Sequence, residues 1–472
     1  MSMSLARKTT LVLLGVAGYT LMLACSCHAA GWSPAQTVAS SRVLQYERPQ
    51  LARDVFGDAV VAWHRQEELN GRLSGVEAVT RRANAAWSSP VTLRGPRLRG
   101  AYAPEVAMDS SGNATAAWSS LSRVEAVSHP VGGSWDRTVT VSQRGPRAEA
   151  FQLAVGARGD AAVVYEQNFG LGLATRRPGA HWRAPRALPG ISSLGVDAPR
   201  VVIDARGEMI IAWVHAQPGK RVQALVLGAN GKPEGPIQTL SRKGPITELQ
   251  LAANADGDAV VVWREEGKNV RPIEAATRLA GRRFTNAVTI SRQQDTDPTT
   301  AIDPRGDATI LFTRTVSAQP ATETPPPGVA MERSTETTTT VEAATRPAHG
   351  RWSAAKPVAP PGRGSTFAPH LAAGPSSGLL MAVWGAIVAP APAVIEASIR
   401  NPNGTWQTPV VISPPASVTP SIASYSPSIT LSANGAATAA WIRQEPLPEP
   451  SNVDPQEPPS FSESIETADY EP

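Results

Sequence analysis

The residues best suited to chemistry in this sequence are two pairs of adjacent glutamates. Glu67 and Glu68 form one pair, and Glu265 and Glu266 form the other. Two carboxyl groups can act as the acid and the base of glycosidic-bond hydrolysis when they face each other across a substrate. Adjacent side chains near a hairpin tip diverge, however, which favours a solvated turn. We therefore predict no catalytic residue, and we keep Glu67 and Glu265 as candidate ligand-binding residues.

Two further ligand-binding candidates, Glu332 and Arg333, lie in the longest insertion of the chain, residues 313–340. That insertion and two others, residues 385–394 and 442–464, are rich in Pro, Thr, Ser and Glu. Loops positioned by a rigid scaffold often carry binding functions, but surface loops also tolerate low-complexity insertions. Both interpretations of these insertions stay open.

Other catalytic and metal-binding patterns are absent from the sequence. The 7 histidines are scattered, and none has the spacing of a zinc-binding pair. The sequence contains no nucleophile elbow, phosphate-binding loop or dinucleotide-binding glycine motif. We expect neither a metal nor a cofactor.

One short phrase recurs along the chain and supplies the elements that must position any site. Its clearest copy, residues 257–263, has a glycine, a run of alanine and valine, and a closing tryptophan. This pattern indicates a short buried strand entered through a glycine turn. Further copies occupy residues 57–63, 112–118, 159–165, 207–213, 306–312, 378–384 and 435–441.

Each copy stands within a longer unit of four predicted strands. A segment such as 103–109 precedes the glycine turn, one such as 76–81 follows the aromatic residue, and a fourth, such as 87–93, opens with tryptophan. The apolar residues alternate with a period of two, which excludes a helical solenoid. Successive closing aromatics are 47 to 72 residues apart, a length that suits the blades of a β-propeller.

The predicted fold class is therefore all-β, with a single eight-bladed β-propeller over residues 31–472 and a seven-bladed ring as the alternative. The predicted blades lie near 46–95, 102–142, 149–189, 198–241, 246–291, 297–360, 367–413, and 425–470 plus 31–40.

The two ends of this domain complement each other. Residues 31–38 resemble a fourth strand with no blade before it, whereas the last unit stops after a third strand at 465–470. We predict that the N-terminal strand joins the last blade, which would close the ring and remove two open sheet edges.

Residues 1–30 have the features of a signal peptide. Arg7 and Lys8 precede an apolar run that is short for a membrane span, and small residues follow it. Cleavage would remove Cys25 and Cys27, the only 2 cysteines. We expect export to the periplasm or the medium, with no transmembrane domain in the mature chain; the alternative is lipid attachment at Cys25 and anchoring at the outer membrane.

The charge of the chain argues against nucleic acid as a partner. The sequence has 44 basic and 40 acidic residues, and the basic ones are spread over every repeat without a run. We expect a monomer whose partner is a glycan or a cell-envelope protein.

All 12 tryptophans stand at repeat positions. Six close second strands: Trp63, Trp118, Trp213, Trp263, Trp384 and Trp441. Six open fourth strands: Trp32, Trp87, Trp135, Trp182, Trp352 and Trp406. Aromatic faces can stack on sugars, but large aromatics also dominate protein cores, so we expect packing between blades.

A glutamate recurs in the predicted third strands: Glu77, Glu125, Glu274, Glu342, Glu396 and Glu466. Arg65, Arg314 and Arg443, at the ends of second strands, are candidate cross-strand partners. A catalytic group is usually a single departure from a repeat, so we expect structural ion pairs here.

The phrase that runs from aspartate through glycine to tryptophan, as at 109–118 and 204–213, resembles the Asp-box repeats of sialidase-type secreted bacterial propellers. The resemblance implies a propeller fold and carries over no catalytic residue, because one extra residue separates Asp from Gly here. We therefore expect an exported, non-enzymatic binding or interaction scaffold. The alternative is a sialidase-like glycoside hydrolase or polysaccharide lyase with acidic residues at the ring axis.

Overall fold

The computed structural model describes residues 31–67, 73–98, 101–143, 148–167, 170–188, 190–191, 195–216, 219–267, 270–317, 337–358, 365–387, 392–414, 423–446 and 461–472. Every regular element within these ranges is a β-strand. Over the same ranges, no helix has the length and apolar character needed to span a membrane.

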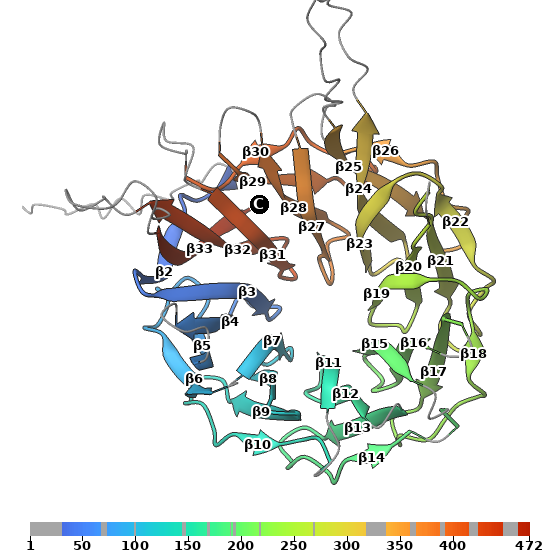
Figure 1. Ribbon diagram of the computed structural model, residues 1–472, viewed down its shortest axis with the longest axis horizontal. Helices are drawn as coiled ribbons and strands as arrows, with labels where there is room; N and C mark the ends of the chain where they lie inside the picture. Colours follow the sequence, from blue (N-terminus) through green and yellow to red (C-terminus); the bar gives the residue numbers. More distant parts are fainter. Residues whose placement is uncertain are drawn as a thin grey trace, which may run out of the picture.

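The strands form eight antiparallel sheets arranged in a ring, the blades of a β-propeller (Figure 1). Blade 1 consists of β3 (Leu44–Arg53), β4 (Ala59–Glu67), β5 (Leu73–Arg81) and β6 (Val91–Leu98). Blade 2 consists of β7 (Ala101–Met108), β8 (Ala114–Ser120), β9 (Arg123–His129) and β10 (Val139–Thr140). Blade 3 consists of β11 (Ala148–Val155), β12 (Ala161–Gln167), β13 (Gly170–Arg176) and β14 (Arg186–Ala187). Blade 4 consists of β15 (Val196–Ile203), β16 (Met209–His215), β17 (Arg221–Leu227) and β18 (Gln238–Thr239).

The second half of the ring repeats this order. Blade 5 consists of β19 (Ile246–Ala253), β20 (Ala259–Glu265), β21 (Ile273–Arg278) and β22 (Val288–Ser291). Blade 6 consists of β23 (Asp295–Ile302), β24 (Ala308–Ser317), β25 (Thr337–Arg346) and β26 (Lys356–Pro357). Blade 7 consists of β27 (Ser365–Ala373), β28 (Leu380–Ile387), β29 (Val394–Arg400) and β30 (Val410–Val411). Blade 8 consists of β31 (Ala423–Leu431), β32 (Ala437–Pro446), β33 (Phe461–Glu471), β1 (Gly31–Trp32) and β2 (Gln36–Ser41). The prediction of an all-β, eight-bladed propeller is confirmed.

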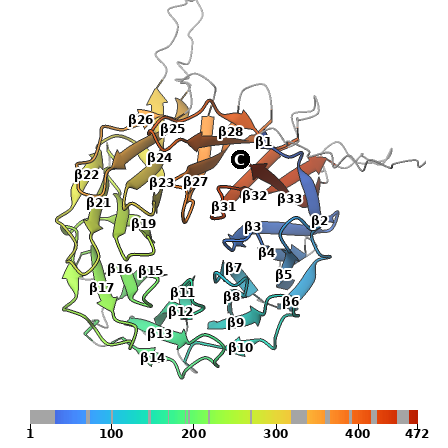
Figure 2. The ribbon, with the colours of Figure 1, turned by 180° about the vertical axis from the view of Figure 1, so that it is seen from behind.

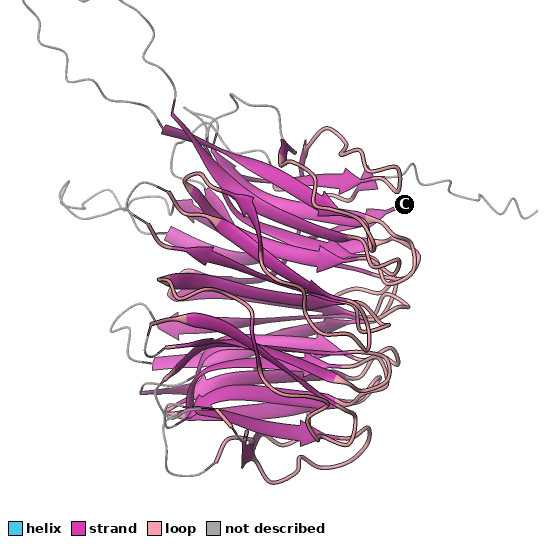
Figure 3. Cartoon of the chain, turned by 90° about the vertical axis from the view of Figure 1, so that its right-hand side faces the viewer, coloured by secondary structure: helices cyan, strands magenta, loops and turns pink. Residues whose placement is uncertain are grey.

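Within each of blades 1 to 7, strands follow chain order from the axis to the rim, with the first strand innermost (Figures 1 and 2). Because neighbouring strands are antiparallel, the turns between first and second and between third and fourth strands share one end of the blades, which we call the turn face. The connections between second and third strands and between blades lie at the other end, the loop face. Figure 3 shows the blades from the side, with strands running between these faces.

The two ends of the described chain meet in blade 8. Strand β2 pairs antiparallel with β33, from Gln36 opposite Thr467 to Ser41 opposite Glu463. Strand β1 pairs with the same strand and places Trp32 opposite Tyr470. The predicted closure by the N-terminal strand is confirmed, and we call β1 and β2 paired with β33 the clasp.

In blades 1, 2, 4 and 6 the aspartate of the repeat builds the turn that follows the first strand. In blade 1, Asp54 Oδ1 accepts hydrogen bonds from the backbone N–H groups of Phe56, Gly57 and Asp58 at 2.9, 2.7 and 2.8 Å. Asp58 in turn accepts from the N–H of Ala83 at 2.8 Å, which ties this turn to the one between the third and fourth strands. Short side-chain acceptors of this kind specify turns because they replace missing backbone partners.

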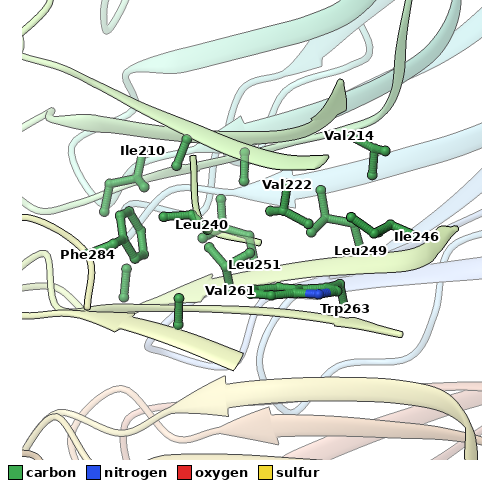
Figure 4. Packing of buried hydrophobic residues seen from close by; sticks show 14 residues of the cluster. Ile210, Val214, Val222, Leu240, Ile246, Leu249, Leu251, Val261, Trp263 and Phe284 are labelled. Atoms are coloured by element: carbon green, nitrogen blue, oxygen red, sulfur yellow. The ribbon is translucent and has the colours of Figure 1, made fainter. Parts of the chain in front are cut away.

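The second strands form the core between blades. Strand β20 is buried at every position except its last residue, because blades 4 and 6 cover its two faces. Trp263, at its end, has no exposed surface and packs with Leu249, Leu251 and residues of blade 4 (Figure 4). A strand covered on both faces needs apolar residues throughout, which explains the uninterrupted apolar run of the repeated phrase.

In blades 2 to 7 the fourth strands are shorter than the sequence predicts. In blade 3 the segment that begins at Trp182 forms only the two-residue strand β14. The N–H groups of Arg183 and Leu188 still donate to Thr175 and Leu171 of β13, at 2.9 and 2.8 Å. Pro185 stands between them and has no N–H to contribute to a ladder. The rim of the ring is therefore less regular than its interior.

Candidate functional site

The repeated tryptophans fall into two structural groups. The six at the ends of second strands have 0% exposure, which confirms that they are core residues. The six that precede or open fourth strands are only partly buried and lie at the rim. Only the second group can contact a ligand.

The repeated third-strand glutamates have structural partners, as expected. Glu125 and Glu396 accept hydrogen bonds from the indole N–H of Trp118 and Trp384, at 3.1 and 2.9 Å. Arg65 pairs with Glu77 at 2.6 Å and Arg314 pairs with Glu342 at 2.5 Å. Burial raises the pKa of Glu342, and the Arg314 guanidinium opposes that rise.

The third predicted partner, Arg443, lies 2.6 Å from Glu445, a different carboxylate from the one expected. Its charge still lowers the pKa of the repeat glutamate Glu466, against the larger effect of burial, which raises it. The glutamate repeat therefore holds tryptophans and arginines in place.

Of the four predicted ligand-binding residues, the structure describes Glu67 and Glu265 and places them in different blades. Glu67 ends β4 in blade 1 and Glu265 ends β20 in blade 5, on opposite sides of the ring (Figure 1). Burial and the charge of Glu274 raise the pKa of Glu265, whereas Arg242 lowers it. Glu332 and Arg333 lie outside the described residues, as does Glu68. No shared site supports the glutamate pairs as a catalytic unit.

The partner of Glu265 in the sequence pair, Glu266, is held by two arginines. Arg264 lies 2.6 Å from one of its oxygens and Arg271 lies 3.1 Å from the other. Its carboxylate therefore neutralises neighbouring cations.

Each first strand, the innermost of its blade, contains a β-bulge and carries one polar residue just beyond it. In blade 4 the bulge falls between Asp197 and Arg200, where Ala198 has a positive φ of 48°. We call the axial ring the eight first-strand residues that pair with the residue before each closing aromatic: Gln50, Glu105, Gln152, Arg200, Gln250, Thr299, His370 and Ser428.

Members of the axial ring join neighbouring blades. Glu105 Oε2 accepts from the backbone N–H of Leu153 in blade 3 at 2.6 Å, and Gln152 Oε1 accepts from Val201 N–H in blade 4 at 2.6 Å. These N–H groups lie on innermost strands, where no further strand can pair with them. Glu105 and Gln152 thus satisfy N–H groups at the inner edges of blades 3 and 4.

The charged members of the axial ring have unusual protonation behaviour. Burial raises the pKa of Glu105 to about 7, although the Leu153 N–H and Arg200 oppose the rise. Burial also lowers the pKa of His370, whose Nδ1 has no hydrogen-bond partner among the described residues. Burial lowers the pKa of Arg200 in turn, and the charge of Glu105 opposes that effect.

Hollows recur between neighbouring blades at the rim of the turn face. The largest, the blade 2/3 groove, has a volume of about 600 Å³ and is lined by residues that include Asp136, Arg137, Arg176, Trp182 and Arg183. Similar hollows of about 280, 70 and 200 Å³ lie between blades 1 and 2, 3 and 4, and 4 and 5. The repeat therefore produces a repeated surface depression.

A cation packs on the rim tryptophan in blades 1 and 3. The guanidinium of Arg81 lies 4.4 Å from the ring centre of Trp87, and that of Arg176 lies 5.3 Å from Trp182. Contacts of this kind attract through the charge distribution of the aromatic ring. Arg176 also donates to the Thr115 hydroxyl of blade 2 at 2.8 Å. The pair therefore forms a preorganised wall of the blade 2/3 groove.

The groove residues are not among the side chains that the sequence singles out as ligand-binding candidates. A signal was nonetheless present, because the cation stands six residues before the tryptophan in both pairs, Arg81 with Trp87 and Arg176 with Trp182. Among the described residues, no cluster of histidine and acidic side chains could hold a metal ion.

Comparison with known proteins finds no match by sequence and several likenesses by structure. No protein-family model matches the chain, and no curated protein matches its sequence. The chain is similar to a solved ulvan lyase of polysaccharide lyase family PL25, with a TM-score of 0.48, 8% identity, and coverage of 90% of this chain and 94% of that one.

Two further solved structures are similar to this chain. The β-propeller domain of the trilobed protease of Pyrococcus furiosus has a TM-score of 0.43 and 9% identity, with 79% of this chain and 99% of that chain covered. The NanB sialidase of Streptococcus pneumoniae has a TM-score of 0.38 and 10% identity, with 93% and 71% covered. The likeness to sialidase-type propellers is therefore one of fold.

Proposed function

We propose that this protein is an exported, non-enzymatic propeller that binds a glycan through the grooves between its blades, with a cell-envelope protein as the alternative ligand. The observation that carries the proposal is the blade 2/3 groove, a hollow of about 600 Å³ with the partly exposed Trp182 in its wall. That volume falls within the usual range for small-ligand sites, and an aromatic face beside polar groups suits a sugar ring. The proposed form is a monomer in the periplasm or the medium, with a lipid anchor at Cys25 as the alternative.

The chemistry of the axial ring favours binding over glycoside hydrolysis. Glycosidases use two carboxyl groups about 5 to 10 Å apart. Among the residues described here, the axial ring contains a single carboxyl group, that of Glu105.

The test is calorimetry and glycan-array binding with the chain from residue 31 onward. We expect Trp182→Ala to reduce sugar binding by about tenfold or more, because a stacked aromatic face contributes on the order of 1 kcal/mol and also shapes the hollow. Val43→Ala, at an exposed residue of the loop face, is the matched control and should bind as the wild type does. The proposal is rejected if no glycan and no envelope protein binds, or if Trp182→Ala binds normally.

One observation favours the enzymatic alternative. A carboxyl group with a pKa of about 7, such as Glu105, can act as a general acid or base near neutral pH. Turnover of a glycoside or polysaccharide that is abolished by Glu105→Gln would replace the binding proposal with a hydrolase or lyase.

A further inference from the structure

The two hollows on either side of blade 3 share side chains at the rim. Arg176 and Arg183 line both the blade 2/3 groove and the hollow between blades 3 and 4. Arg137 belongs to the first hollow, and Arg177 and Arg186 belong to the second. Together these five arginines define a continuous surface around the outer edge of blade 3, which we call the blade 3 strip.

The blade 3 strip is positively charged. Only two acidic residues, Asp136 and Asp160, line its hollows beside the five arginines. Asp160 also lies 3.9 Å from Arg158, which is outside the strip, so Arg158 offsets part of the negative charge of Asp160. Five arginines against two aspartates is a larger proportional excess of positive charge than that of the whole chain, which has 44 basic and 40 acidic residues.

Three arginines of the strip are available for a ligand. Arg137, Arg177 and Arg183 are exposed, and within the described ranges no hydrogen bond or ion pair engages their guanidinium groups. Blade 1 differs at the corresponding edge: Arg82 lies 3.3 Å from Asp58, and Arg81 lies 2.5 Å from Asp469. In blade 3 the equivalent of Asp58 is Asp160, which lies 3.9 Å from Arg158 instead, and among the described residues no ion pair engages Arg177.

Arg176 adds a less exposed positive charge behind this surface. Burial lowers its pKa, and the nearby Asp109 and Asp136 oppose that effect without reversing it. An anion bound in the adjacent groove would stabilise the charged guanidinium.

The distribution of the cations over two adjoining hollows suits an extended ligand. Arg137 lines only the blade 2/3 groove and Arg177 lines only the hollow between blades 3 and 4, whereas Arg183 lines both. Forked guanidinium donors match carboxylate and sulfate groups, and several such donors along a groove match a polymer that carries charge at intervals. A single small anion would engage only one or two of them.

We propose that the blade 3 strip binds an acidic polysaccharide, with its carboxylate or sulfate groups on Arg137, Arg177 and Arg183 and one sugar ring against Trp182. This inference rests on the proposed binding function and narrows the class of ligand. Single-stranded nucleic acid is less well matched, because such strands use a row of stacking aromatics, whereas Trp182 is the one aromatic residue besides His181 that lines these described hollows.

The experiment measures binding of polygalacturonate, dextran and a single-stranded DNA oligonucleotide to the chain from residue 31 onward. The test variant is Arg177→Gln with Arg183→Gln. The matched control is Arg42→Gln with Arg292→Gln, which removes the same charge from two exposed residues of the loop face. Circular dichroism and thermal melting check that both variants fold.

We expect the wild type to bind polygalacturonate more tightly than dextran, and to lose affinity as salt rises from about 50 to about 500 mM. The test variant should bind at least about tenfold more weakly, because each charge-assisted hydrogen bond contributes roughly 1.5 kcal/mol. The control should stay within about twofold, since distant exposed charges interact weakly.

Other results would overturn the inference. Equal weakening in the control would show that net charge alone attracts the polymer. Tighter binding of DNA than of polygalacturonate would replace the acidic polysaccharide with nucleic acid. If dextran binds in a Trp182-dependent way and polygalacturonate does not bind, the acidic ligand is rejected and the proposed function stands. If no carbohydrate and no envelope protein binds, both proposals are rejected.

Discussion

Glu105 owes its properties to its place in the axial ring. The corresponding residues of blades 1, 3 and 5 are the amides Gln50, Gln152 and Gln250. Gln152 offers its side-chain oxygen to Val201 of the next blade, just as Glu105 offers a carboxyl oxygen to Leu153. Glu105 therefore accepts the same kind of hydrogen bond as the amide of Gln152, but its carboxyl group can ionise.

Because blade 2 has a glutamate where blades 1, 3 and 5 have a glutamine, the free energy of unfolding depends on pH. Folding raises the pKa of Glu105 from 4.5 to about 7, so the folded state favours the protonated carboxyl. Its contribution to stability is fully present below about pH 4.5 and is lost as pH rises through 7. We expect Glu105→Gln to be more stable than the wild type at pH 8, by on the order of 1 kcal/mol or more, and nearly equal to it at pH 4.5.

Thermal melts of both proteins across this pH range measure the effect. Gln50→Glu is the reciprocal variant, and we expect it to acquire the same loss of stability at high pH. If the melting temperatures of the wild type and Glu105→Gln differed by the same amount at every pH, the raised pKa of Glu105 would be contradicted.

The glycine turn is the element that sets the contact between blades on the turn face. Gly159 has a φ of 89°, a region that side chains other than glycine rarely adopt. A Cβ atom there would lie 2.8 Å from Asp109 Oδ2, in the turn of the preceding blade. The glycine therefore allows both the turn and the approach of the neighbouring carboxylate.

Gly159→Ala should destabilise the protein by roughly 1 to 3 kcal/mol, since it combines backbone strain with a steric conflict. Gly95→Ala is the control, because a Cβ there would meet nothing within 4 Å. Chemical denaturation compares the two variants with the wild type. Equal midpoints for both variants would show that the turn tolerates a side chain.

The elements were largely predictable from the sequence, but their irregularities were not. The apolar run that ends at Trp263 predicts a buried strand because local pattern and burial agree there. Ala198 precedes Pro199, and a residue before proline usually adopts an extended conformation, so its positive φ could not be expected. That conformation depends on the packing of neighbouring blades around the bulge.

The groove residues were hard to predict for a related reason. The blade 2/3 groove joins Val127 and Arg137 of blade 2 to Arg176 and Trp182 of blade 3. Periodicity within one repeat reports which face of a strand is buried, but it does not report the shape of the gap left between two repeats. Glu67 and Glu265 each stand beside a second glutamate in the sequence, and such a pair of neighbours carries no information about the distance between two blades.

At the scale of the whole molecule, the clasp determines whether the ring stays closed. Ser40 of β2 stands directly opposite Ser464 of β33. We expect Ser40→Cys with Ser464→Cys to form a disulfide that stabilises the ring by up to about 5 kcal/mol, because the bond closes a very long loop. Each single cysteine variant should melt like the wild type.

The measurement is a pair of thermal melts, with and without a thiol reductant. An oxidised double variant that melts at the wild-type temperature would show that the blades unfold without opening the clasp. A gain in melting temperature that disappears on reduction is the expected result.

The clasp also imposes an order on folding. Blades 1 to 7 consist of strands that are neighbours in the chain, so each can form from local hairpins. Blade 8 cannot be completed in that way, because Asp469 and Ser33, which hydrogen-bond in it, are 436 positions apart. Contacts of such long range form slowly and late, since the chain between them must be ordered first. We therefore expect folding to pass through a nearly complete arc with two exposed sheet edges, and we expect aggregation to compete most strongly with the step that joins those edges.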